Sequence, residues 1–439
     1  MSESKLSSVL PNNTIKDSWP RKPVSTIYVE NSNNLSTLED IQWCNDIEMS
    51  FPQQLLGTVN TFRFPRTYQF LGPIVFSFRV AWSNQVDNAI KEDFLAYNVI
   101  KRIRWTVGGT ETLTVEGESL LPLILDQCET EEKKAELLDA AGTAITGTAI
   151  QNIISHYAAV IPCPWSSIEA RGFNCIKPLP LHMLSEPVEL QIELRSRAEV
   201  LSEPTAPAAI SNLKLRFYYG KIGNPEQLKN VVYKWPFTSI FSHRFAIPNQ
   251  VVASIDLNAF RRAELRQLRF HAVLDANTVA NAGLFNTGEK LRNIQLKFNG
   301  QVIWSQENNT DQIWDLIMNK QPSKLPYRKL YKLGSDAVDG VHHKGQATGL
   351  QSALATNDNI IYRGYVSNVA KYNEKYYYNI PLGEMLDKYV KQGHNIGVDV
   401  SKQALTLSFN GLGAAATLFV SYVYSAMYQF DGEMATLVY

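Results

Sequence analysis

The stretch IKRIRWTVGGTETLTVEGESLLPLIL spans Ile100–Leu125, and a version of it returns about 190 residues later in the chain. The second copy, LRNIQLKFNGQVIWSQENNTDQIWDLI, spans Leu291–Ile317. Both run from an alternating strand through a turn dipeptide and a second strand to an apolar segment. The dipeptides, Gly108-Gly109 and Asn299-Gly300, suit a two-residue hairpin that needs positive φ at both positions. An internal repeat of this length predicts two similar domains in tandem.

The strands that open the two copies alternate between apolar and polar residues. Because successive strand side chains point to opposite faces, the apolar residues line one face of a sheet. They are Ile103, Trp105 and Val107 in the first copy and Ile294, Leu296 and Phe298 in the second. The apolar segments that end the copies, Leu120–Leu125 and Ile313–Met318, are compatible with helix.

Further segments have the composition and spacing of strands: Ile74–Trp82, Val188–Leu194, Leu213–Tyr219, Leu265–Val273, Leu405–Phe409 and Thr417–Tyr428. Thr130–Ala141 predicts a short exposed helix with Thr130 as its N-cap. Many short strands with frequent turns predict an all-β fold with paired sheets in each half. Eight strands in two facing sheets form a jelly roll, so we expect two tandem jelly-roll domains with short helices in their loops.

The repeat and the local composition divide the chain into three parts. Residues 1–40 are rich in Ser, Asn, Thr and Pro, which predicts an extended N-terminal arm. Residues 41–225 are expected to form the first jelly roll and residues 226–439 the second, with Gly220–Lys229 as the linker. Within the second, Tyr327–Asn359 is a long polar insertion typical of a surface excursion.

Composition excludes several classes of function. The 42 basic residues balance the 42 acidic ones, whereas proteins that grip phosphate backbones usually carry a basic excess, so sequence-specific nucleic-acid binding is not expected. No apolar run is long enough to span a membrane, and the first 20 residues lack the apolar core of a signal peptide. The four cysteines show no C-x-x-C spacing, which indicates synthesis in a reducing compartment. Cys163 and Cys175 could pair in space, but buried thiols are favoured.

Residues Ile100–Gly142 contain a strand that ends in Gly-Gly, an apolar segment, and a Thr-Glu-Glu-Lys helix that ends at Gly142. A Pro-rich passage then leads from Val160–Trp165 through Leu179–Leu181 into Val188–Leu194. This order resembles the double-jelly-roll major capsid proteins of tailless icosahedral double-stranded DNA viruses, which include the nucleocytoplasmic large DNA viruses and the virophages. The resemblance covers roughly residues 41–430. It implies a homotrimer with a pseudo-hexagonal outline that tiles a capsid beside neighbouring capsomers and minor capsid proteins.

The resemblance further implies a structural protein of the virion, synthesised in the host cytoplasm, and not an enzyme. Neutral net charge suits a shell that does not wrap the genome directly, which leaves room for an internal membrane beneath it. The alternative is a β-sandwich carbohydrate-binding or host-attachment protein, in which the aromatic-rich segment Tyr372–Tyr378 would stack on sugars.

No stretch carries a complete catalytic, cofactor or metal motif. Gly411–Ala416 matches the dinucleotide fingerprint G-x-G-x-x-A, but the strand-like Thr417–Tyr428 follows where that motif requires a helix. Of the seven histidines only His342-His343 are close in sequence, and adjacent strand residues face opposite ways. We therefore expect no catalytic, cofactor-binding or metal-ligating residues and no cofactor.

Two basic clusters are open to two interpretations. One is Lys101-Arg102-Arg104 and the other is Arg261-Arg262 with Arg266. A solvated strand face is the usual place for such residues. A subunit contact is the functional interpretation, because arginine is enriched at protein interfaces.

Overall fold

The computed structural model describes residues 42–67, 69–82, 95–126, 154–163, 179–181, 186–200, 208–221, 233–260, 265–275, 291–306, 378–382, 404–431 and 434–438, with positions 137, 140, 141, 184, 289, 400 and 401. Strands dominate these residues, and the helices are short: α3 (Leu95–Asn98), α4 (Gly117–Asp126) and α6 (Arg197–Val200). Within the described ranges, no helix is long and apolar enough to cross a membrane.

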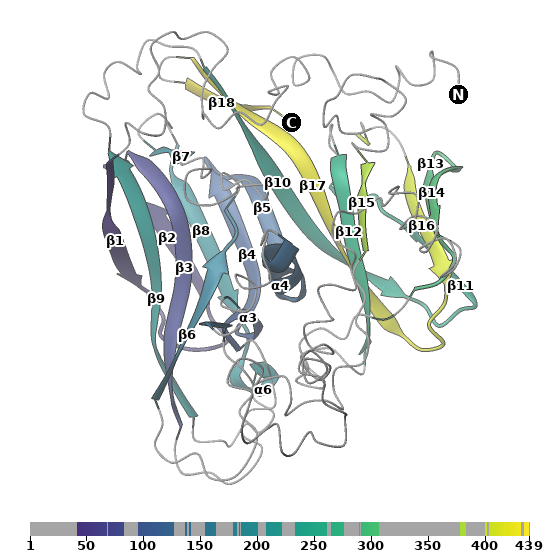
Figure 1. Cartoon of the computed structure of the whole chain (residues 1–439), viewed down its shortest axis with the longest axis horizontal. Coiled ribbons are helices and arrows are strands. Elements are labelled where there is room, and N and C mark those ends of the chain that lie inside the picture. Colours follow the sequence, from purple (N-terminus) through teal and green to yellow (C-terminus); the bar gives the residue numbers. More distant parts are fainter. Residues whose placement is uncertain are drawn as a thin grey trace, which may run out of the picture.

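The first half forms two facing sheets (Figure 1). One has the strand order β1-β9-β3-β6 with β7 beside β3, and the other has the order β5-β4-β8-β2. The strands are β1 (Gln42–Ser50), β2 (Val59–Phe64), β3 (Phe70–Trp82), β4 (Ile100–Val107), β5 (Thr110–Glu116), β6 (Ile154–Ile161), β7 (Leu179–Pro180), β8 (Val188–Leu194) and β9 (Ala208–Lys221).

The second half repeats this arrangement with sheets β15-β12-β17-β10 and β11-β16-β13-β14, and β18 pairs with β17. The strands are β10 (Tyr233–Ile247), β11 (Val252–Asp256), β12 (Leu265–Leu274), β13 (Ile294–Phe298), β14 (Gln301–Gln306), β15 (Tyr378–Pro381), β16 (Leu405–Asn410), β17 (Ala416–Asp431) and β18 (Met434–Val438).

Leaving aside β7 and β18, the strands of the two halves pair in the same order. In each half the first strand pairs with the eighth, the eighth with the third, and the third with the sixth. The other sheet runs second, seventh, fourth, fifth in both halves. This pairing is that of a jelly roll. The predicted all-β fold of two tandem jelly rolls with short helices is therefore confirmed.

The hairpin turns of the repeated stretch have the predicted geometry. Gly108 and Gly109 connect β4 to β5 with φ of 59° and 76°. Asn299 and Gly300 connect β13 to β14 with φ of 48° and 78°. Positive φ at both central residues matches the right-handed twist of the flanking strands, which is why these dipeptides suit the turn.

The two hairpins also share an irregularity. The register shifts between Trp105 and Thr106 in β4, and between Leu296 and Lys297 in β13. Each shift lies two residues before the end of its strand, so the hairpins correspond residue by residue. Trp105 and Leu296 are equivalent and both fully buried, as the duplication predicts.

Each jelly roll encloses its own apolar core. In the first, the Trp105 ring stacks on Phe64 with 5.6 Å between centroids, and its Nε1 donates to the Pro162 carbonyl oxygen at 2.9 Å. A buried tryptophan needs a partner for its N–H, and this bond supplies one. Phe76, Phe78 and Val80 of β3 line the same core, as their alternation predicts.

The remaining sequence predictions have mixed outcomes. The six predicted strands are all present, most of them longer than their patterns, and Leu120–Leu125 lies in helix α4. The linker prediction was wrong at its start, because Gly220 and Lys221 still belong to β9. The boundary between residues 225 and 226, the arm 1–40, the insertion 327–359, the segment Ile313–Met318 and most of 130–141 lie outside the described residues and stay predictions.

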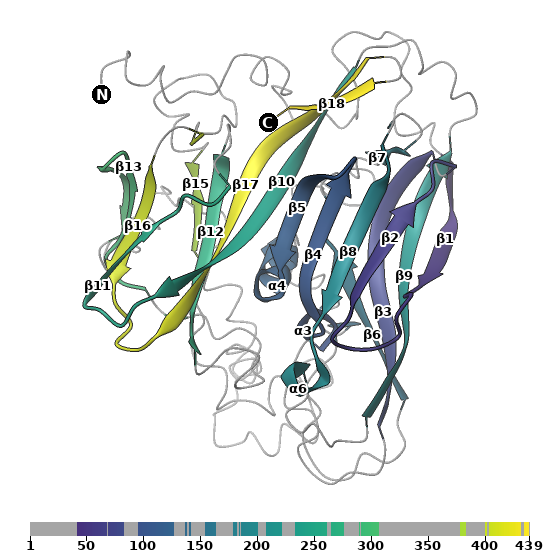
Figure 2. The ribbon, with the colours of Figure 1, turned by 180° about the vertical axis from the view of Figure 1, so that it is seen from behind.

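The two jelly rolls are joined through their sheets. β10 runs parallel to β5 and meets it where Phe241 is opposite Thr114, which makes one nine-stranded sheet across both halves. Figures 1 and 2 show β10 and β17 running diagonally past the first jelly roll, with α4 beside them. A polar network is built at this joint.

Candidate functional site

The dinucleotide fingerprint does not form a nucleotide site. Residues 411–415 form the turn between β16 and β17, and strand β17 begins at Ala416 where the motif requires a helix. Gly413 has a φ of 73°, so it serves the turn. A Cβ on Gly411 would lie 1.6 Å from the Gln250 carbonyl oxygen, so this glycine permits a close approach between two loops of the same jelly roll.

The titratable residues considered in the sequence do not converge. Among the described residues, no group of three or more His, Cys, Asp or Glu side chains is arranged to hold a metal ion. Cys163 is a buried thiol whose Sγ lies 3.4 Å from the Ile161 carbonyl oxygen, and burial raises its pKa. Cys175 and the pair His342-His343 lie outside the described residues.

The first basic cluster lies on the outer face of β4 and is paired across the sheet. Lys101 and Arg102 bind Glu193 of β8 at 2.9 and 2.8 Å, and Arg104 lies 3.5 Å from Glu111 of β5. Burial alone would raise the pKa of Glu193, but the hydrogen bonds from the two cations lower it. The cluster therefore lies on a partly exposed strand face of the single chain, and its interpretation as a subunit contact stays a prediction.

The second basic cluster is only partly described. Arg266 is buried in β12, so it does not lie on a solvated face. Arg261 and Arg262 lie outside the described residues, and the subunit-contact interpretation of this cluster stays a prediction. The aromatic segment Tyr372–Tyr378 is described only at Tyr378. That residue is buried, stacks on Phe270, and donates to the Leu291 carbonyl oxygen, so it is a core residue and not a sugar platform.

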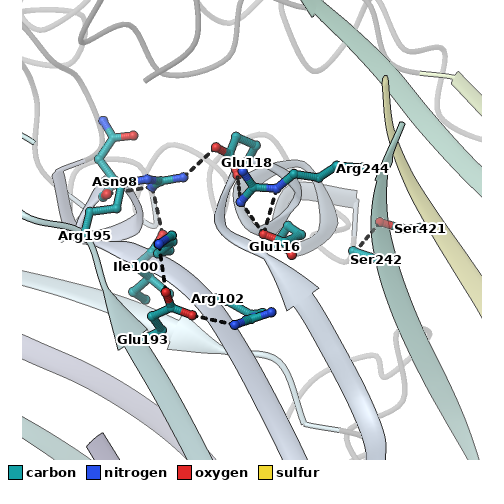
Figure 3. A network of polar contacts seen from close by, with 11 residues as sticks. Asn98, Ile100, Arg102, Glu116, Glu118, Glu193, Arg195, Ser242, Arg244 and Ser421 are labelled. Atoms are coloured by element: carbon teal, nitrogen blue, oxygen red, sulfur yellow. Dashed lines mark hydrogen bonds and ion pairs between the residues drawn. The ribbon is translucent and has the colours of Figure 1, made fainter. Parts of the chain in front are cut away.

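Buried charges that sequence reasoning missed lie at the joint between the jelly rolls (Figure 3). Arg195 follows β8, and its Nη1 donates to the carbonyl oxygens of Asn98 and Ile100 at 2.7 and 2.8 Å. Its Nη2 lies 2.8 Å from Oε1 of Glu118 in α4, which makes an ion pair. The two side chains are 3% and 9% exposed, so removing either partner would leave a buried charge.

Helix α4 reaches this position because it begins with a glycine. Gly117 lies against β4, and a Cβ there would be 2.1 Å from the Ile100 carbonyl oxygen and 2.9 Å from Nη2 of Arg195. Only a residue without a side chain allows the helix to begin this close to the strand.

A second arginine enters the network from the other jelly roll. Arg244 of β10 donates through Nε to Oε2 of Glu116 at 3.1 Å and also binds it through Nη2, while Oε2 of Glu118 lies 3.6 Å away. Burial alone would lower the pKa of Arg244, but the carboxylates of Glu118 and Glu116 outweigh it and raise the pKa. Glu118 therefore lies between an arginine of each jelly roll (Figure 3).

Apolar and neutral polar contacts continue the joint along β10 and β17. Ile240 and Val423 belong to the apolar core of the first jelly roll although they lie on strands of the second. Ser242 and Ser421 share a buried hydrogen bond of 2.7 Å between the two strands. Because these strands are covered on both faces, they connect the two apolar cores.

The network is suited to holding the halves together. The carboxylates of Glu116 and Glu118 are engaged by the guanidinium groups of Arg195 and Arg244. The arrangement is that of a structural clamp.

No family model and no curated protein matches the sequence. Solved structures do match its fold. The PBCV-1 virus capsid model aligns over 94% of this chain and 98% of its own at 12% identity, with a TM-score of 0.59. The Faustovirus major capsid protein aligns over 91% and 92% at 7% identity, with a TM-score of 0.54. A chain of the Sputnik virophage structure aligns over 93% and 91% at 11% identity, with a TM-score of 0.50.

The chain has the double-jelly-roll fold of viral major capsid proteins. The likeness extends over nearly the whole of each chain, so both jelly rolls and the joint between them lie within the matched part. The fold part of the sequence resemblance is thereby confirmed.

Proposed function

We propose that this chain is the major structural subunit of an icosahedral virion shell, that it forms homotrimers, and that it has no enzymatic activity. The observation that carries the proposal is the double-jelly-roll architecture, which capsid proteins of PBCV-1 and Faustovirus match over 94% and 91% of this chain. A sheet that continues from one sandwich into the other, together with the ion pairs of Arg244 with Glu116 and Glu118, gives a rigid building block, which a shell requires.

Several finer features of the proposal come from the sequence. Residues 1–40 would act as an extended arm, with residues 41–225 and 226–439 as the two jelly rolls. Trimers with a pseudo-hexagonal outline would contact neighbouring capsomers and minor capsid proteins. The balanced charge supports a shell that makes no sequence-specific contact with nucleic acid. Such a shell would enclose either the genome directly or an internal membrane. Synthesis would occur in the reducing host cytoplasm.

The mass of the purified protein tests the proposal. A homotrimer has three times 49.5 kDa, about 150 kDa, by light scattering at micromolar concentration. Obligate subunits bury large interfaces and rarely leave stable free monomers, so the trimer should persist on dilution. A stable monomer that binds glycans would contradict the proposal and support the carbohydrate-binding alternative.

A further inference from the structure

The joint between the jelly rolls uses a different surface on each of them. The first contributes its fifth strand, β5, and the second contributes its first strand, β10. A head-to-tail contact between like units leaves one copy of each surface unused. The unused surfaces are the fifth strand of the second jelly roll, β14, and the first strand of the first, β1.

β14 is the last described strand at its edge of the sheet. β14 pairs with β13, and no described strand lies on its other side. Counted from their turns, Thr114 of β5 corresponds to Ser305 of β14. Thr114 lies opposite β10 and is 4% exposed, whereas Ser305 is exposed and nearby Val302 is 45% exposed. Within the described residues, the position that a neighbouring strand covers in the first jelly roll is therefore exposed in the second.

The edge of β1 is the matching surface. β1 and β10 hold the same place in their jelly rolls, because each is the first strand and pairs with the eighth. In the described chain, β1 pairs with β9 alone. Strand edges left in this state are templates for pairing with another chain.

We propose that β14 of one copy docks beside β1 of a second copy and repeats between chains the β5–β10 joint that lies within each chain. This inference rests on the proposed function, since it assigns the surface through which the capsid subunits would join. Because the contact is head-to-tail, successive copies close into a ring when the rotation between them allows it.

A charge at Ser305 tests the contact. Ser305 is exposed in the single chain, so Ser305→Lys should leave the fold of the subunit unchanged, as checked by circular dichroism. In the docked state the lysine would be buried without a partner, as Thr114 is buried by β10. The concentration at which half of the trimer dissociates should rise by about tenfold or more, measured by sedimentation.

The matched control is Ser254→Lys. Ser254 is also an exposed serine, and it lies on β11, at the opposite edge of the same sheet. This variant should dissociate like the parent protein. A trimeric parent with an unaffected Ser305→Lys variant, or equal weakening by both lysines, would overturn the inference and leave the proposed function intact. A monomeric parent would overturn both.

Mixing identifies the strand that meets β14. A Ser305→Lys copy keeps its β1 edge, so it should still bind the free β14 edge of a parental copy. Native mass spectrometry should then detect mixed dimers of two times 49.5 kDa, about 99 kDa. Their absence, with parental oligomers present, would refute the pairing of β14 with β1.

Discussion

Replacing Gly117 with alanine should destabilise the first jelly roll more than the same change at Gly109. The new Cβ would lie 2.1 Å from the Ile100 carbonyl oxygen, so the helix or the strand must move by about 1 Å to reach ordinary contact. That oxygen accepts a 2.8 Å bond from the Arg195 guanidinium. Losing a charged hydrogen bond costs about 1.5–3 kcal/mol. Disturbing the buried ion pair brings the expected loss to about 3–5 kcal/mol.

Gly109 is the matched control within the same repeated stretch. It has a φ of 76°, and no atom lies within 4 Å of the position that a Cβ would take, so alanine there meets only the left-handed backbone penalty of about 1–2 kcal/mol. Calorimetry of the full chain should show a melting temperature lower by about 10 °C for Gly117→Ala and by about 4 °C for Gly109→Ala. Equal shifts would refute the argument that the approach of α4 to β4 requires a glycine.

Three further changes probe other parts of the molecule. Burial lowers the pKa of His271 from 6.5 to about 3, so the neutral histidine contributes its full stability above pH 6.5, and this contribution is lost as the pH falls. Between pH 7 and 5, the free energy of unfolding in urea should fall by about 2 kcal/mol more for the parent than for His271→Phe. Equal losses in the two proteins would contradict this. Gly300→Val places a β-branched residue at a φ of 78° and should cost about 1–3 kcal/mol, seen as a lower melting temperature; an unchanged value would rule out the strained turn. Glu118→Gln should lower the free energy of unfolding, measured with a chemical denaturant, by about 3 kcal/mol because it breaks a buried ion pair. The control Glu189→Gln, in an exposed pair, should lower it by at most about 1 kcal/mol. Similar losses would argue against a buried clamp.

Strands with one buried face were predictable from the sequence. β8 alternates strictly between buried and partly exposed residues, and so does β13, because each covers a core on one face only. β1 was not predicted from the sequence, because its register shifts between Cys44 and Ile47 and this shift breaks the alternation of apolar and polar residues. β10 was not predicted either, because both of its faces are covered: Ile240 lies in one core and Phe241 in the other.

The clamp was not predictable from the sequence. Its charged residues Glu116, Glu118, Arg195 and Arg244 spread over more than a hundred positions, and each is of a type that normally lies at the surface. Nothing in the local pattern shows that the chain brings them together. The one local signal is Gly117, a glycine at the start of an apolar helix where a capping residue would be expected.

The sheet that continues from one jelly roll into the other also has a mechanical consequence. A hinge between domains needs a loop that absorbs the rotation, whereas here a strand pair and the ion pairs of Arg244 with Glu116 and Glu118 cross the boundary. Bending the subunit would require breaking them together. If such units tile a closed surface, each one should keep its shape wherever it lies, and the angle between facets must be taken up in the contacts between neighbouring units. Curvature of the shell would then arise at the contacts between subunits and not within the subunits.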